Sequence, residues 1–358
     1  MNRPTEPSVL TPHRRIVELD ALRALAAISL VLFHLTHVYA NKYGFTRPLV
    51  AQWNYGAYGT AMFFVLSGFV NSMSLLRRGR PVDFVAARLI RIVPVFLIAI
   101  FANWLVIGMA PVQSHVTTAQ VLANLTLLPK VFGYECLDPV MWTLQVEMLF
   151  YGLLVAMFCT GLLRRYIVGW GGMLALSLVV CRTLNHHVAG GDDSVWWSVL
   201  ESMRHLFLLD HVPLFASGFA IYMIKIGQGR WWAAGGLIAV SIGVLSMIDQ
   251  GRHNPVAVVL ITALVAACGY GRLPFLRLQP LLYLSTISYS LYLFHNNFGS
   301  IVIYRLDNGY VPPELAFLAA LAMAWAIAVL VTGRIEGPMT RWLRRRWDSR
   351  RSTIMSAG

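Results

Sequence analysis

The sequence has few charged residues and few cysteines for its length. Charged residues make up 13% of its 358 residues, whereas soluble domains carry about a quarter. Hydrophobic residues make up 57% of the chain, and the mean hydropathy is +0.62. These values exclude an ordinary soluble protein and predict one membrane-embedded domain, because no stretch is long enough for a separate soluble core. The four cysteines, three of them in or at apolar segments, favour neither a disulfide framework nor a metal site.

The apolar segments also lack the features of other membrane architectures. The ten-residue alternation of an outer-membrane barrel is missing, so the helix is the structure that satisfies the backbone groups in lipid. No internal repeat is present, and nothing therefore supports the two-fold architecture of many transporters. The first 16 residues contain prolines and no apolar core. We expect the first span, rather than a cleaved signal peptide, to direct insertion.

Ten segments of the chain are long and apolar enough for a membrane helix, which needs roughly 20 residues. They lie near 21–40, 58–76, 92–110, 141–161, 166–182, 205–225, 231–248, 255–270, 281–303 and 314–333. Residues 116–132 are apolar but contain Asn124, Pro129 and Lys130, which indicates an interfacial or loop helix. The predicted fold is all-α, a polytopic membrane helix bundle of about ten transmembrane helices. Residues 1–335 form this domain, and residues 336–358 form a basic cytoplasmic tail.

Basic residues in the loops orient this bundle. With ten spans, both termini lie on one side, which carries 21 of the 29 lysines and arginines, against seven on the other side. The positive-inside rule assigns the richer side to the cytoplasm, so we expect both termini there. These loops account for the formal charge of +13, and we predict no nucleic-acid partner. The tail, TRWLRRRWDSRR, is typical of a helix that lies on an anionic inner leaflet.

Ionisable side chains inside a span are costly unless they are paired or solvated, which makes each one a candidate functional group. Arg23 and His34 share the first span. Their separation of eleven residues puts them on one helix face, about 16 Å apart. An alternative role for Arg23 is an anchor paired with Glu18 or Asp20. An alternative for His34 is a neutral histidine that packs between helices.

Two arginines and one carboxylate belong to the third and fourth spans. Arg88 and Arg91 lie at the cytoplasmic mouth of the third span, on one helix face. Two guanidinium groups side by side suit the capture of phosphate, although the positive-inside rule also explains arginines there. Glu147 is the only acidic residue of the fourth span. It is either a functional carboxylate or a charge partner that holds two helices together. Asp210 and His211, near the outer start of the sixth span, are further candidates.

A polar stripe on the ninth span consists of Ser288, Tyr292 and His295, at positions i, i+4 and i+7. Such a stripe either lines a channel or acceptor site, or joins helices by hydrogen bonds. Counting residues from the span edges places His34, Glu147 and His295 at one depth, about 5 Å outside the bilayer centre. We therefore expect an anion-binding entrance lined by arginines and an acid–base centre deeper in.

Five sequence segments carry these residues in a characteristic order. They are ELDALRALAA, in which ten residues separate Arg23 from His34; FFVLSGF at 63–69; RLIR at 88–91; WTLQVEMLFY at 142–151; and ISYSLYLFH at 287–295. In this order and spacing the sequence resembles the membrane acyltransferase-3 family, whose members O-acylate bacterial surface polysaccharides and some small molecules, generally from acetyl-CoA or a related thioester. It departs from the family after the last histidine, where Asn296 and Asn297 replace an aromatic residue or glutamine followed by proline.

The resemblance implies an enzyme of the bacterial inner membrane. It would transfer an acyl group, in the simplest case acetyl, from a cytoplasmic CoA thioester to a carbohydrate hydroxyl of a cell-surface or exported polysaccharide or its lipid-linked precursor. Arg23, Arg88 and Arg91 would bind the donor phosphates, and Glu147 would orient the imidazole of His34. His34 either removes the proton of the acceptor hydroxyl or first accepts the acyl group itself. Acetyl-CoA is then a co-substrate, no cofactor is bound permanently, and the partners are acyl-CoA, the carbohydrate and membrane lipid.

Three other functions fit parts of the same pattern. The acceptor could be a small molecule such as a macrolide sugar, because nothing in the loops identifies it. A transporter of a lipid-linked sugar or an organic anion would also need buried charges. A non-catalytic scaffold of a polysaccharide-synthesis complex would tolerate changes at His34 and Glu147. Release of free thiol from a thioester by the purified protein separates an enzyme from the other two classes.

Overall fold

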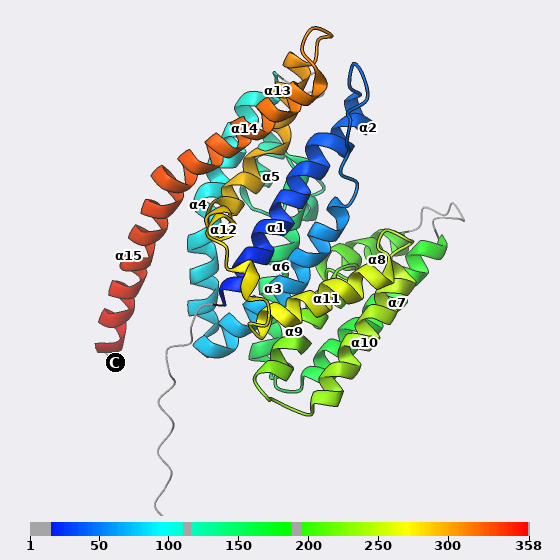
Figure 1. Cartoon of the computed structure of the whole chain (residues 1–358). Helices are drawn as coiled ribbons and strands as arrows, with labels where there is room; N and C mark the ends of the chain where they lie inside the picture. Colours follow the sequence, from blue (N-terminus) through cyan, green and yellow to red (C-terminus); the bar gives the residue numbers. More distant parts are fainter. Residues whose placement is uncertain (1–15, 110–115, 188–194, 357–358) are drawn as a thin grey trace, which may run out of the picture.

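The computed structural model describes residues 16–109, 116–187 and 195–356, and within these ranges the chain forms helices and no strands (Figure 1). The α-helices are α1 Val17–Phe33, α2 Tyr39–Tyr43, α3 Gly56–Arg78, α4 Pro81–Ile107, α5 Thr118–Leu125, α6 Trp142–Cys159, α7 Tyr166–His187, α8 Val195–Leu206, α9 Val212–Lys225, α10 Trp231–Ile248, α11 Pro255–Gly269, α12 Gln279–Phe294, α13 Asn296–Leu306, α14 Pro313–Val331 and α15 Gly337–Ser356. Shorter helical segments are η1 His34–Val38, η2 Pro129–Phe132, η3 Pro139–Met141, η4 Pro274–Leu276 and η5 Thr332–Glu336. The prediction about the N-terminal residues falls mostly outside the described part.

Seven helical segments of the described chain are long and apolar enough to cross a membrane, by length and composition. They are Val17–Tyr43, Tyr58–Arg78, Pro81–Ile107, Pro139–Cys159, Tyr166–His187, Trp231–Ile248 and Pro313–Arg351. This confirms an all-helical, multi-pass membrane protein. The number of ten spans and the side on which the termini lie stay predictions.

Three of the ten predicted spans are not among these seven segments. The segments predicted at 205–225 and 255–270 contain α9, with 14 residues, and α11, with 15. At 1.5 Å per residue these helices are roughly 20 Å long, shorter than the roughly 30 Å hydrocarbon core. Twelve residues of α9 are buried inside the protein, so its backbone need not match the lipid thickness.

The third difference is a break in the segment predicted as 281–303. Helix α12 ends at Phe294 and α13 begins at Asn296, with His295 between them. The side-chain amide of Asn296 and the backbone N–H of Asn297 both donate to the carboxylate of Asp138, at 2.8 and 3.2 Å. The polar pair that follows the last histidine therefore ties the start of α13 to the loop before α6, and the prediction of one unbroken span was wrong.

Helix α1 lies in the middle of the bundle, in contact with α3, α11 and α12 (Figure 1). On one side, α3 packs closely on α9. A Cβ atom on Gly68 of α3 would lie 2.2 Å from the carbonyl oxygen of Phe215, and one on Gly218 of α9 would lie 2.0 Å from that of Val65. Small residues of this kind allow membrane helices to approach until their backbones touch. The core beside this contact contains the stacked rings of Phe150 and Phe215, 3.9 Å apart.

Helices α14 and α15 are joined by the π-helical segment η5. The boundary predicted between residues 335 and 336 thus falls inside a continuous helix, Pro313–Arg351. Helix α15, red in Figure 1, runs along α4, and Arg351 forms an ion pair of 3.4 Å with Asp83 near the start of α4. The tail predicted to lie on a lipid surface therefore packs, with one of its faces, against the bundle.

Candidate active site

Two connected cavities lie where α1, α3, α4 and α12 meet. The inner cavity, of about 120 Å³, lies between these helices and α6, and Glu147, Ser288 and Tyr292 are among the residues that line it. The outer cavity, of about 780 Å³, extends to η5 and α15. Arg23, Arg88 and Arg91 line both. The three arginines predicted to gather at an entrance thus stand at the junction of the two cavities.

Arg23 contacts the acidic residue expected for an anchor. Its Nη1 atom lies 3.0 Å from a carboxylate oxygen of Asp20, one turn earlier on α1. Glu18 instead accepts two hydrogen bonds from Arg277, at 2.6 and 2.8 Å. The pairing with Asp20 agrees with the anchor alternative, but the guanidinium of Arg23 also faces the cavities, where it adds positive charge.

Arg88 and Arg91 lie inside α4 and not before it, because this helix begins at Pro81 and not near residue 92. They are seven and ten residues into the helix, roughly 10 to 15 Å from its start. The guanidinium of Arg88 lies over the rings of Phe84 and Tyr151, at 5.6 and 5.9 Å. Its Nε atom is buried and has no hydrogen-bond partner within the described chain. A buried donor without a partner is costly, and an anionic ligand in the cavity would remove that cost.

Glu147 faces the inner cavity and does not orient His34 as predicted. One of its oxygens accepts hydrogen bonds from the hydroxyls of Tyr151, at 2.5 Å, and Ser67, at 3.4 Å. The carboxylate lies in the same cavity as Arg23, Arg88 and Arg91. Its position therefore makes it a counter-charge for the arginines, because the ring of His34 hydrogen-bonds other groups.

His34 and His295 contact each other at the break between α12 and α13. Nε2 of His295 lies 3.1 Å from Nδ1 of His34. Nδ1 of His295 lies 2.8 Å from the carbonyl oxygen of Tyr292, and Nδ1 of His34 lies 2.8 Å from that of Leu30. A carbonyl oxygen only accepts hydrogen bonds, so both Nδ1 atoms carry a proton in the neutral rings.

This pattern leaves one ring nitrogen available for chemistry. The one Nδ1–H of His34 is shared between the carbonyl oxygen of Leu30 and Nε2 of His295, so both nitrogens of His295 have partners. Nε2 of His34 keeps its lone pair, as required for a base or nucleophile. His34 is the first residue of the π-helical segment η1, a rare geometry that is frequent at functional sites. Leu30 and Tyr292, whose carbonyls orient the two rings, also line the inner cavity. The cavity therefore reaches the turn of helix next to the histidine pair.

Ser288 and Tyr292 have local hydrogen-bond partners. The hydroxyl of Ser288 donates to the carbonyl oxygen of Ser285, at 2.9 Å. The hydroxyl of Tyr292 contacts the hydroxyl of Thr143, at 2.6 Å, and the carbonyl oxygen of Val140. Tyr292 thus joins α12 to α6, as the helix-joining alternative predicts, while its side chain also lines the inner cavity.

A buried polar cluster centred on Asp138 was not predicted from the sequence. In addition to its bonds with Asn296 and Asn297, Asp138 accepts from the backbone N–H of Val140, at 3.2 Å. Asn297 in turn donates to the side chain of Asn103 on α4, at 2.9 Å. Burial raises the pKa of Asp138 to about 6, although these hydrogen bonds act in the opposite direction. Asn296 and Asn297 could have indicated this cluster in the sequence, because polar side chains inside an apolar segment need hydrogen-bond partners.

Two further contributions to the cavities were not predicted. The side-chain oxygen of Asn71 lines the inner cavity without a hydrogen-bond partner in the described residues, and Asn71 is 2% exposed. Helix α15 contributes Arg341 and Arg344 to the outer cavity. Their spacing of three residues was visible in the sequence, but nothing local showed which face of α15 meets the bundle.

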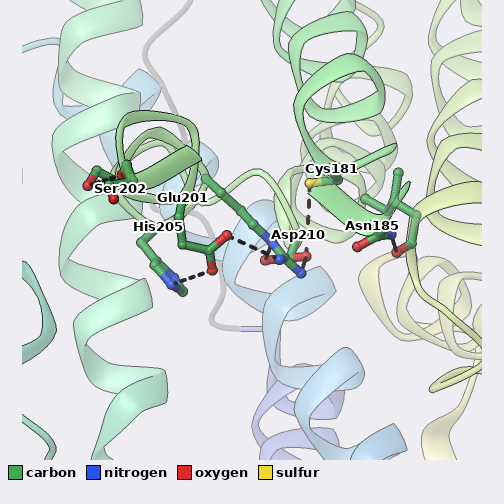
Figure 2. A network of polar contacts seen from close by, with 9 residues as sticks. Cys181, Asn185, Glu201, Ser202, His205 and Asp210 are labelled. Atoms are coloured by element: carbon green, nitrogen blue, oxygen red, sulfur yellow. Dashed lines mark hydrogen bonds and ion pairs between the residues drawn. The ribbon is translucent and has the colours of Figure 1, made fainter. Parts of the chain in front are cut away.

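A second polar network lies at the junction of α7, α8 and α9 (Figure 2). Arg204 donates two hydrogen bonds to Asp210, at 2.8 and 2.9 Å. Glu201 forms ion pairs with Arg204, at 3.5 Å, and with His205, at 3.1 Å, and Figure 2 shows Cys181 directed at Asp210. None of these residues lines either cavity. The predicted candidate Asp210 thus joins three helices. The part of the chain that is described holds no group of three metal-ligating side chains.

Comparison with known proteins identifies the family. A family model described as an acyltransferase domain matches residues 16–333. The exopolysaccharide production protein ExoZ of Rhizobium meliloti is 30% identical, over 85% of this chain and 94% of its own length. The O-acetyltransferase OatA of Staphylococcus aureus is 27% identical, over 92% of this chain and 58% of its own length. No solved structure matches at a significant level. The family model and these relatives show that the chain belongs to the acyltransferase-3 family and is a membrane enzyme that transfers acyl groups other than amino-acyl groups.

Proposed function

We propose that this protein is an O-acetyltransferase of the bacterial cytoplasmic membrane. It moves the acetyl group of acetyl-CoA to a hydroxyl of an exported or cell-surface polysaccharide, or of its lipid-linked precursor. The observation that carries the proposal is the outer cavity rich in arginine, which shares its arginines with an inner cavity lined by Leu30 and Tyr292. The carbonyl oxygens of these two residues contact the histidine pair, although neither histidine itself lines either cavity. The names of ExoZ and OatA, which refer to exopolysaccharide production and O-acetyl transfer, support the choice of acceptor and acyl group.

The donor phosphates bind at the junction of the cavities. Arg23, Arg88 and Arg91 place three guanidinium groups there, and arginine suits phosphate because its planar fork can donate two parallel hydrogen bonds. A ligand phosphate also supplies an acceptor for the unpaired Nε of Arg88. The narrow pantetheine arm then occupies the inner cavity and brings the thioester toward His34.

Acyl transfer uses the free nitrogen of His34. As the acceptor oxygen attacks the thioester carbonyl carbon, Nε2 of His34 takes the hydroxyl proton. The carbon–sulfur bond then breaks, and the proton passes from Nε2 to the leaving thiolate, which gives free CoA thiol and the new ester. The same nitrogen also serves the second route, in which it first bonds to the acyl carbon and thiolate leaves. The acceptor oxygen then displaces the imidazole, and the hydroxyl proton goes to the thiolate, which again gives the ester and free CoA thiol. In both routes His295 and Leu30 hold the ring so that Nε2 is the reactive atom.

The test is acetyl transfer by protein purified in detergent. We expect free thiol release from acetyl-CoA to rise when the acceptor polysaccharide is present, and His34→Ala to lower that rate by about 10²- to 10⁴-fold. The control is His37→Ala, one turn further along the helix, where the imidazole contacts Asn41 and stacks on Phe33. Turnover by folded His34→Ala at the rate of His37→Ala would disprove the assignment of His34.

The donor site is tested separately by binding. Arg88→Ala combined with Arg91→Ala removes two of the three arginines at the junction, and we expect acetyl-CoA affinity to fall by at least about tenfold. Isothermal titration with wild-type protein and with this variant measures the change. Unchanged affinity in the folded variant would show that the thioester donor binds elsewhere.

A further inference from the structure

Helix α15 has two basic faces with different surroundings. Gly337, Thr340, Arg341 and Arg344 line the outer cavity. Trp342, Arg345, Arg346, Ser349 and Arg350 line a separate shallow groove of the same helix. At 3.6 residues per turn the two sets are centred on opposite sides of the helix, and Arg345 is the member of the second set nearest to Arg341. The positive-inside rule explains arginines near a membrane, but it does not explain why two of them are directed into a cavity.

The inward face of α15 is held in place at both ends. At the start of the helix, Glu336 accepts hydrogen bonds from Ser290 of α12, at 2.9 Å, and from Thr332, at 3.2 Å. Toward its end, Arg351 pairs with Asp83 of α4, at 3.4 Å. These contacts turn the face of α15 that carries Arg341 and Arg344 toward the outer cavity, and both side chains are exposed.

The outer cavity has a large excess of positive charge. Seven arginines and two carboxylates line it, and both carboxylates, Asp20 and Glu336, have partners in the protein. Its volume of about 780 Å³ is in the range of sites that bind nucleotide-sized ligands. We divide the arginines by position. Arg23, Arg88 and Arg91 are the junction arginines, which reach both cavities. Arg77, Arg78, Arg341 and Arg344 are the outer arginines, which line the outer cavity and not the inner one.

Coenzyme A has phosphates at two places. A diphosphate joins the pantetheine arm to the ribose, and a separate phosphate is attached to the 3′ oxygen of that ribose. When the thioester points into the inner cavity, the diphosphate reaches the junction first and the 3′-phosphate lies further out. The junction arginines therefore match the position of the diphosphate, and the outer arginines match that of the 3′-phosphate.

We propose that α15 completes the donor site, with Arg341 and Arg344 binding the 3′-phosphate of acyl-CoA. This inference rests on the proposed function, because it assumes that a CoA thioester enters through the outer cavity. Binding of the 3′-phosphate by α15 would add donor specificity that the junction arginines alone do not supply. The enzyme discriminates between acyl-CoA and donors that lack the 3′-phosphate, and the C-terminal helix is a part of the binding site.

The experiment compares acetyl-CoA with acetyl-3′-dephospho-CoA, which differs only in that phosphate. We expect wild-type protein to bind acetyl-CoA about 10- to 100-fold more tightly, as estimated for charge-assisted hydrogen bonds. Arg341→Ala combined with Arg344→Ala should lower acetyl-CoA affinity to that of the dephospho donor, while affinity for the dephospho donor stays within about twofold. Arg346→Ala with Arg350→Ala, on the opposite side of the helix, should keep the preference. If the alanine variant does not fold, glutamine at both positions keeps most of each side chain and removes the charge.

The outcomes separate the two proposals. If folded wild-type protein does not bind acetyl-CoA, the proposed function fails. If binding depends on Arg88 and Arg91 but the Arg341/Arg344 variant keeps its preference for the 3′-phosphate, the donor site stands and the role of α15 is wrong. The measurements are repeated in nanodiscs of phosphatidylcholine with and without phosphatidylglycerol. An effect of the variant that appears only with the anionic lipid would show that the two arginines contact lipid headgroups, and would also overturn the inference.

Discussion

The contacts between His34 and His295 predict that replacing one histidine lowers kcat far more than replacing the other, although the two look equivalent in the sequence. Replacing His295 with leucine removes the acceptor at 3.1 Å from Nδ1 of His34, but the carbonyl oxygen of Leu30 at 2.8 Å remains. His34 therefore keeps the same tautomer and loses one neutral hydrogen bond, worth about 0.5 to 1.5 kcal/mol. If all of that loss appears in the transition state, kcat falls by about 2- to 12-fold. Removal of the base itself, by His34→Ala, costs about 10²- to 10⁴-fold.

The assay is initial-rate thiol release at several acetyl-CoA concentrations, which separates kcat from KM. His295→Leu should lower kcat and leave the KM for acetyl-CoA unchanged, because His295 lines neither cavity. His295→Gln should recover part of the rate, since its amide oxygen can accept from Nδ1–H of His34. Thermal melting confirms that each variant is folded. Equal losses for His295→Leu and His34→Ala, with no recovery by glutamine, would refute the hydrogen-bond assignment and make His295 a direct participant.

Two further predictions concern the scaffold. Gly68→Ala should lower the melting temperature, because its Cβ would lie 2.2 Å from a backbone oxygen of Phe215 and overpacking costs about 1 to 3 kcal/mol. The matched control is Gly152→Ala, which should not lower the melting temperature because no neighbouring atom lies within 4 Å. Since burial raises the pKa of Asp138 to about 6 from an ordinary 3.8, the folded state binds this proton more tightly than the unfolded chain. The contribution of Asp138 to the free energy of unfolding is therefore greatest below about pH 4 and decreases by about 3 kcal/mol as the pH rises through 6. Asp138→Asn should abolish this slope in melting curves recorded from pH 4 to 7.5, and an unchanged slope would assign it to other groups.

Several features of the site could be predicted because they depend on neighbours in the sequence. Arg23, Arg88 and Arg91 were predicted to gather at an anion-binding entrance from charges inside apolar segments. The structure places all three at one junction, and anion binding there stays a prediction. The predicted common depth of His34 and His295 agrees with their contact, because counting residues along a regular helix gives height. Position along the helix axis does not show toward which side of the helix a side chain points. For that reason Glu147 was predicted to contact His34, whereas in the structure it contacts Tyr151.

The sequence by itself determined that this is a helical membrane protein, that its arginines concentrate on particular loops and helix ends, and which residue types could hold and use an acyl thioester. These properties follow from local composition, because lipid requires every backbone polar group to be satisfied within its own segment. Only the tertiary structure decided the partners. His34 and His295 are 261 residues apart, the break at His295 depends on Asp138 in another segment, and α15 turns Arg341 and Arg344 inward because Ser290 and Asp83 hold its two ends. Contacts of this kind depend on which helices pack against one another and in which orientation, and the periodicity of residues along the chain does not show this.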